Sequence, residues 1–124
     1  MSIAILENGE SRTLEFKSEL PKGKQLAQTV VAFANGAGGE LLIGVSDDCK
    51  AIGIGNTDRF EMADRIAAMI YDNCSPQIAF DTFVREINGQ PVMVVKVYPG
   101  RLKPYYLKSM GRDAGVFIRI GASN

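Results

Sequence analysis

The hydrophobic residues of the first half of the chain fall into three regular patterns. Residues 13–17 alternate between apolar and polar side chains, as in a half-buried strand. Residues 24–35 place apolar side chains three and four positions apart, which predicts a helix that ends at Asn35-Gly36. Residues 40–45 are almost continuously apolar, which is typical of a central strand.

The second half continues with one more helix and several strands. Residues 58–71 have helical spacing, and Thr57 or Asp58 can cap their N-terminus. The opposite parity of Phe80 and Phe83 predicts a β-bulge in the strand that contains them. Four further segments are expected to be strands, the first two of them joined in a hairpin by Asn88-Gly89: 78–87, 91–98, 104–107 and 116–120.

The resulting order β-α-β-α-β-β-β-β predicts the class of the fold. It favours an α+β domain, most simply a two-layer α/β sandwich in which two helices pack on a mixed, mostly antiparallel sheet. A chain of 124 residues suits one domain, and we expect it to span residues 1–124.

The composition excludes several classes of function. There is no histidine, so a Ser-His-Asp relay and a histidine-ligated zinc site are both excluded. No apolar run approaches the roughly 20 residues of a membrane span, so no membrane partner is expected. The cysteines, Cys49 and Cys74, have neither metal-binding nor disulfide-framework spacing, which favours a reduced, cytoplasmic setting.

The charges are unevenly distributed along the chain. Residues 1–95 hold 8 basic and 13 acidic side chains, whereas residues 96–124 hold 6 basic ones and a single acidic one, Asp113. Basic residues interleaved with aromatic ones suit phosphates and stacked bases, although a solvated face of a strand pair is the alternative. The candidate nucleic-acid contacts are Arg101, Lys103, Tyr105, Tyr106, Lys108, Arg112 and Arg119.

Clustered carboxylates are the second candidate site. The set consists of Glu10, Glu15, Asp47 and Asp48. Glu15 lies on the polar side of a predicted strand, and Asp47 and Asp48 follow the predicted central strand. Carboxylates at strand ends hold Mg²⁺ or Mn²⁺ through hard oxygen ligands. The alternative is structural: Glu15 pairs with a lysine, and the two aspartates form a turn.

A glycine-rich run, Gly36-Ala37-Gly38-Gly39, has the composition of a phosphate cradle but not its position. A phosphate loop lies between a strand and a helix, so that the amides of the helix N-terminus face the phosphate. Here the glycines follow a predicted helix and enter a predicted strand. A tight turn explains them better, and the sequence offers no phosphate loop for ATP.

Taken together, these stretches resemble the Schlafen AlbA-type domain. The resemblance is carried in order along the chain by Glu10-Ser-Arg-Thr-Leu-Glu15-Phe-Lys17, Phe33-Ala-Asn-Gly-Ala-Gly-Gly-Glu-Leu-Leu-Ile-Gly-Val-Ser-Asp47, Ser75-Pro76, Pro104-Tyr-Tyr106 and Phe117-Ile-Arg119-Ile-Gly121. It implies a two-layer α/β fold and a DNA-binding module at the N-terminus of a longer transcriptional regulator. Further C-terminal domains are then expected beyond Asn124.

The resemblance also implies an enzymatic alternative. Some Schlafens are metal-dependent endoribonucleases, and Glu10, Glu15 and Asp47 match their three carboxylates, with Lys17 placed to neutralise transition-state charge. That activity would need Mg²⁺ or Mn²⁺. The vertebrate nucleases join two lobes, whereas this chain supplies one, so a homodimer would have to replace the second. A third hypothesis is a dimerisation or interaction domain without nucleic acid.

Overall fold

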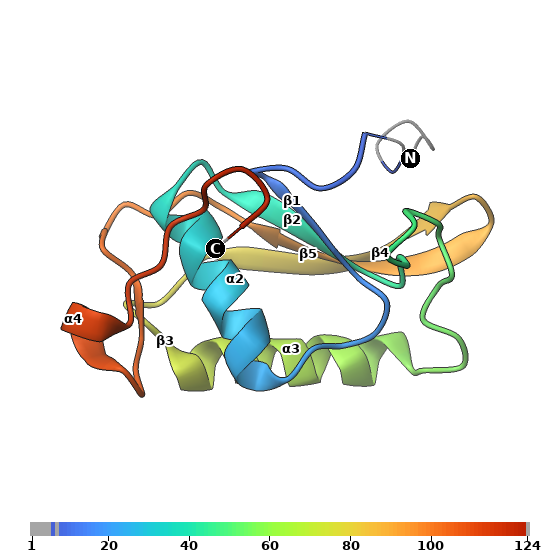
Figure 1. Cartoon of the computed structure of the whole chain (residues 1–124). Helices are drawn as coiled ribbons and strands as arrows, with labels where there is room; N and C mark the ends of the chain where they lie inside the picture. The colour runs from blue at the N-terminus through green and yellow to red at the C-terminus, as the bar shows by residue number, and fades with distance from the viewer. Residues whose placement is uncertain (1–5, 7, 124) are drawn as a thin grey trace.

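The computed structural model describes residues 6 and 8–123, and it is built around one four-stranded sheet (Figure 1). The strands lie in the order β1 (Leu14–Lys17), β2 (Gly39–Ile43), β5 (Gln90–Val97) and β4 (Phe80–Ile87). β1 and β2 run parallel, and the other two neighbouring pairs are antiparallel. The predicted mixed, mostly antiparallel sheet is therefore confirmed, and β2 is central as expected.

Two long helices cover one face of this sheet (Figure 1). α2 (Gly23–Asn35) buries most of its length, because its apolar side chains follow helical spacing on the face turned to the strands. α3 (Arg59–Asn73) packs against α2 and crosses it at a steep angle (Figure 1). It begins where the Asp58 carboxylate accepts hydrogen bonds from the amides of Phe60 and Glu61. The helical predictions are confirmed, and Asp58 is the N-cap.

The sheet separates two apolar clusters because successive strand side chains point to opposite faces. Leu41 and Ile43 of β2 belong to the larger cluster, which the helices cover. Leu42 belongs to the smaller cluster on the other face, together with Phe16 and Val94. β1 follows the same alternation, so its Glu15 points to the helix-covered face.

The final third of the chain differs from the prediction. β6 is confined to Tyr106–Leu107 and pairs with the two-residue β3 (Cys74–Ser75), and a short helix, α4 (Gly111–Ala114), follows it. The strand predicted over 116–120 is wrong: this segment makes only bridges at its ends, Val116 with Tyr106 and Ile120 with Ser123. The Phe117 carbonyl accepts a hydrogen bond from the Asn35 side chain instead of a strand partner.

The predicted bulge at Phe80 and Phe83 is also wrong. The pairing of β4 with β5 is continuous from Phe80 opposite Val97 to Ile87 opposite Gln90. Phe80 packs against the helix-side cluster, and Phe83 lies on the opposite face with the Arg85 guanidinium 5.2 Å from its ring centre. Each face of this edge strand therefore carries one of the two phenylalanines. This explains why their positions differ in parity without a bulge.

None of the helices that the structure describes has the length and apolar character needed to span a lipid bilayer.

Candidate nucleic-acid interface

Four cationic side chains between residues 101 and 112 are exposed, and we call them the basic segment: Arg101, Lys103, Lys108 and Arg112. The chain that carries them runs past the C-terminal ends of α2 and α3 (Figure 1). These four are the members of the predicted contact set that the structure places at the surface. Tyr106, a fifth member, is half-buried in β6.

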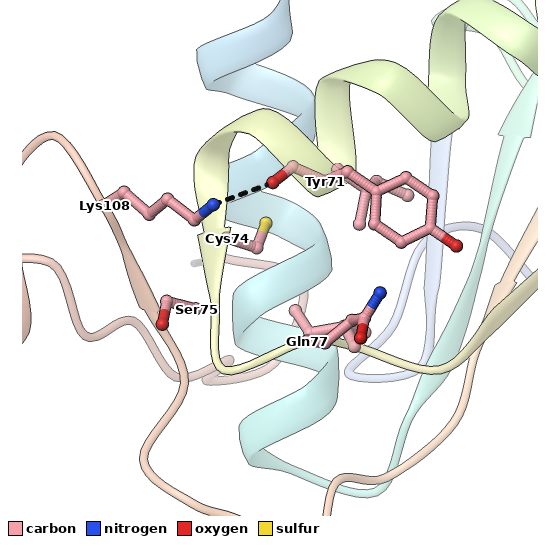
Figure 2. Close-up of a pocket in the computed structure, with 7 residues that line it drawn as sticks. Tyr71, Cys74, Ser75, Gln77 and Lys108 are labelled. Carbon is pink, nitrogen blue, oxygen red and sulfur yellow. Dashed lines mark hydrogen bonds between the residues drawn. The ribbon is translucent and has the colours of Figure 1, made fainter.

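The two lysines of the basic segment also meet helix ends. The Lys108 ammonium donates a hydrogen bond to the Tyr71 carbonyl at 3.0 Å, in the last turn of α3 (Figure 2). The Lys103 ammonium donates to the Gly36 carbonyl, just beyond α2, at 3.4 Å. Neither helix has a basic residue in its own last turn. The lysines therefore supply, from a distant part of the chain, the positive charge that a helix C-terminus favours.

The two arginines of the basic segment have no such structural task. The side chains of Arg101 and Arg112 make no hydrogen bond or ion pair with any residue that the structure describes, and both are exposed. The N–H donors of their guanidinium groups are therefore available to a ligand. Pairs of these donors have the geometry to bind two oxygens of one phosphate.

Tyr105 was predicted to stack on bases, and its burial corrects that prediction. The residue is only 3% exposed. Its hydroxyl accepts a hydrogen bond from the Leu102 amide at 3.0 Å, and its ring lies so close to Gly100 that a Cβ there would be 2.0 Å from the ring edge. A ring packed on its own loop presents no face to a ligand, so Tyr105 is a structural residue.

Asn35, the last residue of α2, organises the same region. Its amide nitrogen donates to the carbonyls of Tyr105 and Phe117, both at 2.9 Å, and its oxygen accepts from the Tyr105 amide at 2.7 Å. The side chain thus replaces a strand partner for two separate segments. Its place before a glycine turn was the only sequence signal for this role.

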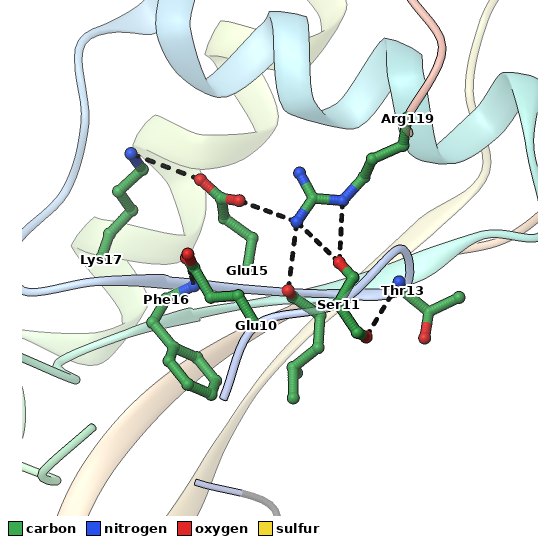
Figure 3. Close-up of polar contacts among 8 residues, drawn as sticks. Glu10, Ser11, Thr13, Glu15, Phe16, Lys17 and Arg119 are labelled. Carbon is green, nitrogen blue, oxygen red and sulfur yellow. Dashed lines mark hydrogen bonds and ion pairs between the residues drawn. The ribbon is translucent and has the colours of Figure 1, made fainter. Parts of the chain in front are cut away.

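Arg119 is the most buried cation of the C-terminal third, and its contacts are structural (Figure 3). Its guanidinium lies 2.8 Å from a Glu15 carboxylate oxygen and donates to the carbonyls of Ser11 and Leu14 at 2.9 and 3.1 Å. The Phe33 ring centre is 4.9 Å away. With 2% of its side chain exposed, Arg119 cannot reach a phosphate, which corrects its predicted role.

Glu15 is the anionic centre of this cluster. Lys17 lies 3.4 Å from its second oxygen, so each of the two carboxylate oxygens faces a cation. The side chain is only 11% exposed because it points to the helix-covered face, beneath the C-terminal segment. The structural alternative considered for Glu15, pairing with a lysine, therefore holds, and Arg119 adds the stronger partner.

The other two carboxylates of the predicted triad lie in different environments. One Glu10 oxygen accepts a hydrogen bond from the Phe16 amide at 2.8 Å, which satisfies a backbone donor of the outer strand β1. Asp47 is exposed in the turn after β2. Beside it, Asp48 accepts a hydrogen bond from the Ser46 hydroxyl, which lowers the pKa of the Asp48 carboxyl.

These carboxylates do not fit a divalent metal. Within residues 6 and 8–123, no three aspartate, glutamate, cysteine or histidine side chains gather as a metal-binding group. Glu15 is already neutralised by two cations, and Glu10 is held by a backbone amide. Glu10, Glu15 and Asp47 are therefore not gathered into the predicted Mg²⁺ or Mn²⁺ site, and Lys17 is paired with Glu15.

The glycine run forms a tight turn. The amides of Gly36 and Gly38 both donate to the Phe33 carbonyl, so the run closes α2. Gly38 has a φ of +81°, and a Cβ there would be 2.6 Å from the Val97 carbonyl oxygen. At Gly39 a Cβ would be 2.6 Å from the Phe33 ring. The glycines therefore permit close backbone packing against β5 and α2.

The buried thiol of Cys74 is not a nucleophile at neutral pH. Cys74 is buried between α3 and α2, and this burial raises the pKa of its thiol to about 12. The thiolate is the reactive form of cysteine, so Cys74 stays protonated and inert near pH 7.

The fold and its surface define a small α+β module with an exposed cationic segment. The solution structure of the N-terminal domain of an ATP-dependent DNA helicase RecG-related protein from Nitrosomonas europaea is similar. It is 26% identical, with a TM-score of 0.71, and the match covers 100% of this chain and 92% of that one. The crystal structure of the DIP2311 protein from Corynebacterium diphtheriae shares the fold at 22% identity and a TM-score of 0.65.

The second match covers 90% of this chain but only 24% of the Corynebacterium protein, so the chain spans about a quarter of that longer relative. No curated protein matches the sequence. The family model for the Schlafen AlbA_2 domain matches residues 10–124. The chain therefore belongs to the Schlafen AlbA_2 family, as the motifs indicated.

Proposed function

We propose that this domain binds the phosphate backbone of nucleic acid through the basic segment. The observation that carries the proposal is the exposure of Arg101 and Arg112, whose guanidinium groups have no partner among the described residues. Lys103 and Lys108 add positive charge within the same stretch of chain. Cations of this kind provide the sequence-independent part of nucleic-acid affinity.

The structural comparison supports DNA as the ligand class. The similar domain from Nitrosomonas europaea stands at the N-terminus of a protein named for a DNA helicase. In this proposal the module holds a longer DNA-binding regulator on its target in the cytoplasm. Both cysteines are free, in keeping with a reducing compartment.

The test compares two charge reversals of equal size. Arg101→Glu/Arg112→Glu changes the basic segment, whereas Arg59→Glu/Arg65→Glu changes two exposed arginines of α3. Binding of a labelled DNA duplex is measured by fluorescence anisotropy across a salt series. Each lost phosphate contact is expected to reduce the slope of log K against log salt by about 0.9.

We expect the basic-segment variant to lose affinity and salt dependence, and the α3 variant to lose little of either. The lysines are left intact because they also contact helix ends, and changing them would mix folding with binding. Equal losses in the two variants, or no binding of the wild-type protein to either duplex or single-stranded DNA at low salt, would contradict the proposal.

A further inference from the structure

A hollow of about 260 Å³ lies where the end of α3 meets β3 and the chain that follows it (Figure 2). Ile70 and Ile78, both buried, give it an apolar lining. Tyr71, Gln77 and Lys108 line it with exposed side chains. Its volume falls just below the roughly 300–1,000 Å³ of pockets for drug-sized ligands, which suits a single flat ring system.

Tyr71 offers an aromatic surface at this hollow. The residue is 50% exposed. The Phe80 ring contacts it edge-on, with 5.9 Å between ring centres and 60° between the planes. This contact orients the Tyr71 ring but leaves much of its surface open to solvent. An oriented, open ring is a stacking platform for a base.

Polar groups with unused hydrogen-bonding atoms lie around the Tyr71 ring. The Lys108 ammonium uses one of its three donors on the Tyr71 carbonyl, at 3.0 Å, and keeps two for a phosphate (Figure 2). The Gln77 amide and the Ser75 hydroxyl make no hydrogen bond with any described residue. A carboxamide presents a donor and an acceptor side by side, which complements the edge of an unpaired base.

A second hollow, of about 420 Å³, continues from the first. It shares Tyr71, Gln77 and Ile78 with it and is also lined by Tyr98 and Asp81. The Lys96 ammonium lies 5.3 Å from the Tyr98 ring centre, so a cation stands beside this hollow as well. The Asp81 carboxylate accepts a hydrogen bond from the Tyr98 hydroxyl at 2.6 Å and places one negative charge here. We therefore expect a bound phosphate to lie next to Lys96 or Lys108, away from the Asp81 carboxylate.

We propose that these two hollows, the Tyr71 site, bind unpaired bases of a single-stranded nucleic acid. Tyr71 stacks on a base, Gln77 contacts its edge, and Lys108 contacts the neighbouring phosphate. The inference rests on the proposed function and names the form of nucleic acid that the domain prefers. Alternating aromatic and cationic groups along a groove are the general solution for single strands, because every base has a face that can stack.

The experiment uses the intact chain and two single-stranded DNA dodecamers of equal charge, one of mixed sequence and one composed of abasic sites. Affinities are measured by anisotropy for the wild-type protein, Tyr71→Ala, Tyr71→Phe and the matched control Phe60→Ala. Phe60 is also an exposed aromatic residue of α3, but it lies at the other end of the helix. Thermal unfolding of each variant checks that it is folded.

We expect Tyr71→Ala to bind the mixed-sequence strand roughly 5- to 150-fold more weakly, as for loss of one stacked base. Tyr71→Phe and Phe60→Ala should bind as the wild-type protein does, and all four should bind the abasic strand equally. The Tyr71 site would be refuted if Tyr71→Ala and Phe60→Ala lost the same affinity, or if Tyr71→Ala also bound the abasic strand more weakly. Either result would leave the proposed binding of the phosphate backbone intact. If the wild-type protein binds neither strand nor duplex, both proposals fail.

Discussion

The Asn35 side chain pairs with the backbone of Tyr105, seventy residues away, as one strand would pair with another. It donates to the Tyr105 carbonyl at 2.9 Å and accepts from the Tyr105 amide at 2.7 Å. A third hydrogen bond reaches the Phe117 carbonyl. One side chain therefore attaches the segment that carries the exposed cations to the end of α2.

Replacing Asn35 with alanine should release this segment. Three hydrogen bonds worth about 0.5–1.5 kcal/mol each are lost, and partly buried backbone groups are left without partners. We expect a loss of about 3 kcal/mol in the free energy of unfolding in urea, together with faster proteolysis after residue 100. Asn56→Ala, at an exposed loop position, is the control and should cost under about 0.5 kcal/mol. A loss of that same size in Asn35→Ala would refute the anchoring role.

Arg119 and Lys17 contact the same carboxylate but should contribute very differently to stability. Arg119→Ala leaves Glu15 without its buried partner and should cost about 3–5 kcal/mol in urea unfolding. Lys17 is 40% exposed, so Lys17→Ala should cost about 1 kcal/mol or less. The double variant Arg119→Met/Glu15→Gln should recover part of the larger loss, because it removes both charges.

Similar losses for the two single variants would show that the burial of Arg119 does not add to its contribution to stability.

The same variants also separate the structural role of Arg119 from nucleic-acid binding. Since Arg119 is not exposed to a phosphate, folded Arg119→Met/Glu15→Gln protein should keep the salt dependence of nucleic-acid binding measured for the wild type.

Two glycines with similar backbone angles should respond differently to alanine. Gly38 has a φ of +81° and Gly55 a φ of +64°, so both substitutions place a side chain in the left-handed region. At Gly38 the new Cβ would also lie 2.6 Å from the Val97 carbonyl oxygen, whereas at Gly55 nothing lies within 4 Å. We expect Gly55→Ala to cost about 1 kcal/mol and Gly38→Ala at least about 2 kcal/mol more, by thermal and urea unfolding. Equal costs would show that the turn against β5 can relax.

Burial of Cys74 predicts a loss of stability in alkali. Burial raises the pKa of the thiol from 9.0 to about 12, so above pH 9 the unfolded chain loses a proton that the folded protein keeps. Stability should therefore be unaffected by this group below pH 9 and fall by about 1.4 kcal/mol per pH unit between pH 9 and 12. Urea unfolding from pH 8 to 11 should show a shallower decline for Cys74→Ala than for the wild type. Cys49→Ala is the control, and parallel declines in all three proteins would contradict the prediction.

The sequence alone determined most of the sheet and both long helices. The spacing in residues 24–35 and 58–71 predicted α2 and α3 closely, and Asn88-Gly89 located the hairpin of β4 and β5. These elements are predictable because their hydrophobic period is local: it depends on which side chains lie two, three or four positions apart. The family motifs could be identified for the same reason, because each is a run of neighbouring residues. The match over residues 10–124 confirms the family.

Only the tertiary structure decided which charged and aromatic residues face solvent. The basic C-terminal residues look alike in sequence, yet Arg119 is buried against Ser11, 108 positions away, while Arg101 and Arg112 stay exposed. Tyr105 is enclosed by its own loop and by Asn35, whereas Tyr71 remains half exposed beside Phe80. Such contacts join parts of the chain that no local pattern relates, and the burial of a charge depends on the partner that arrives from elsewhere. The sequence therefore determined the elements and the family, and the packing of distant segments decided the surface that is left to bind a ligand.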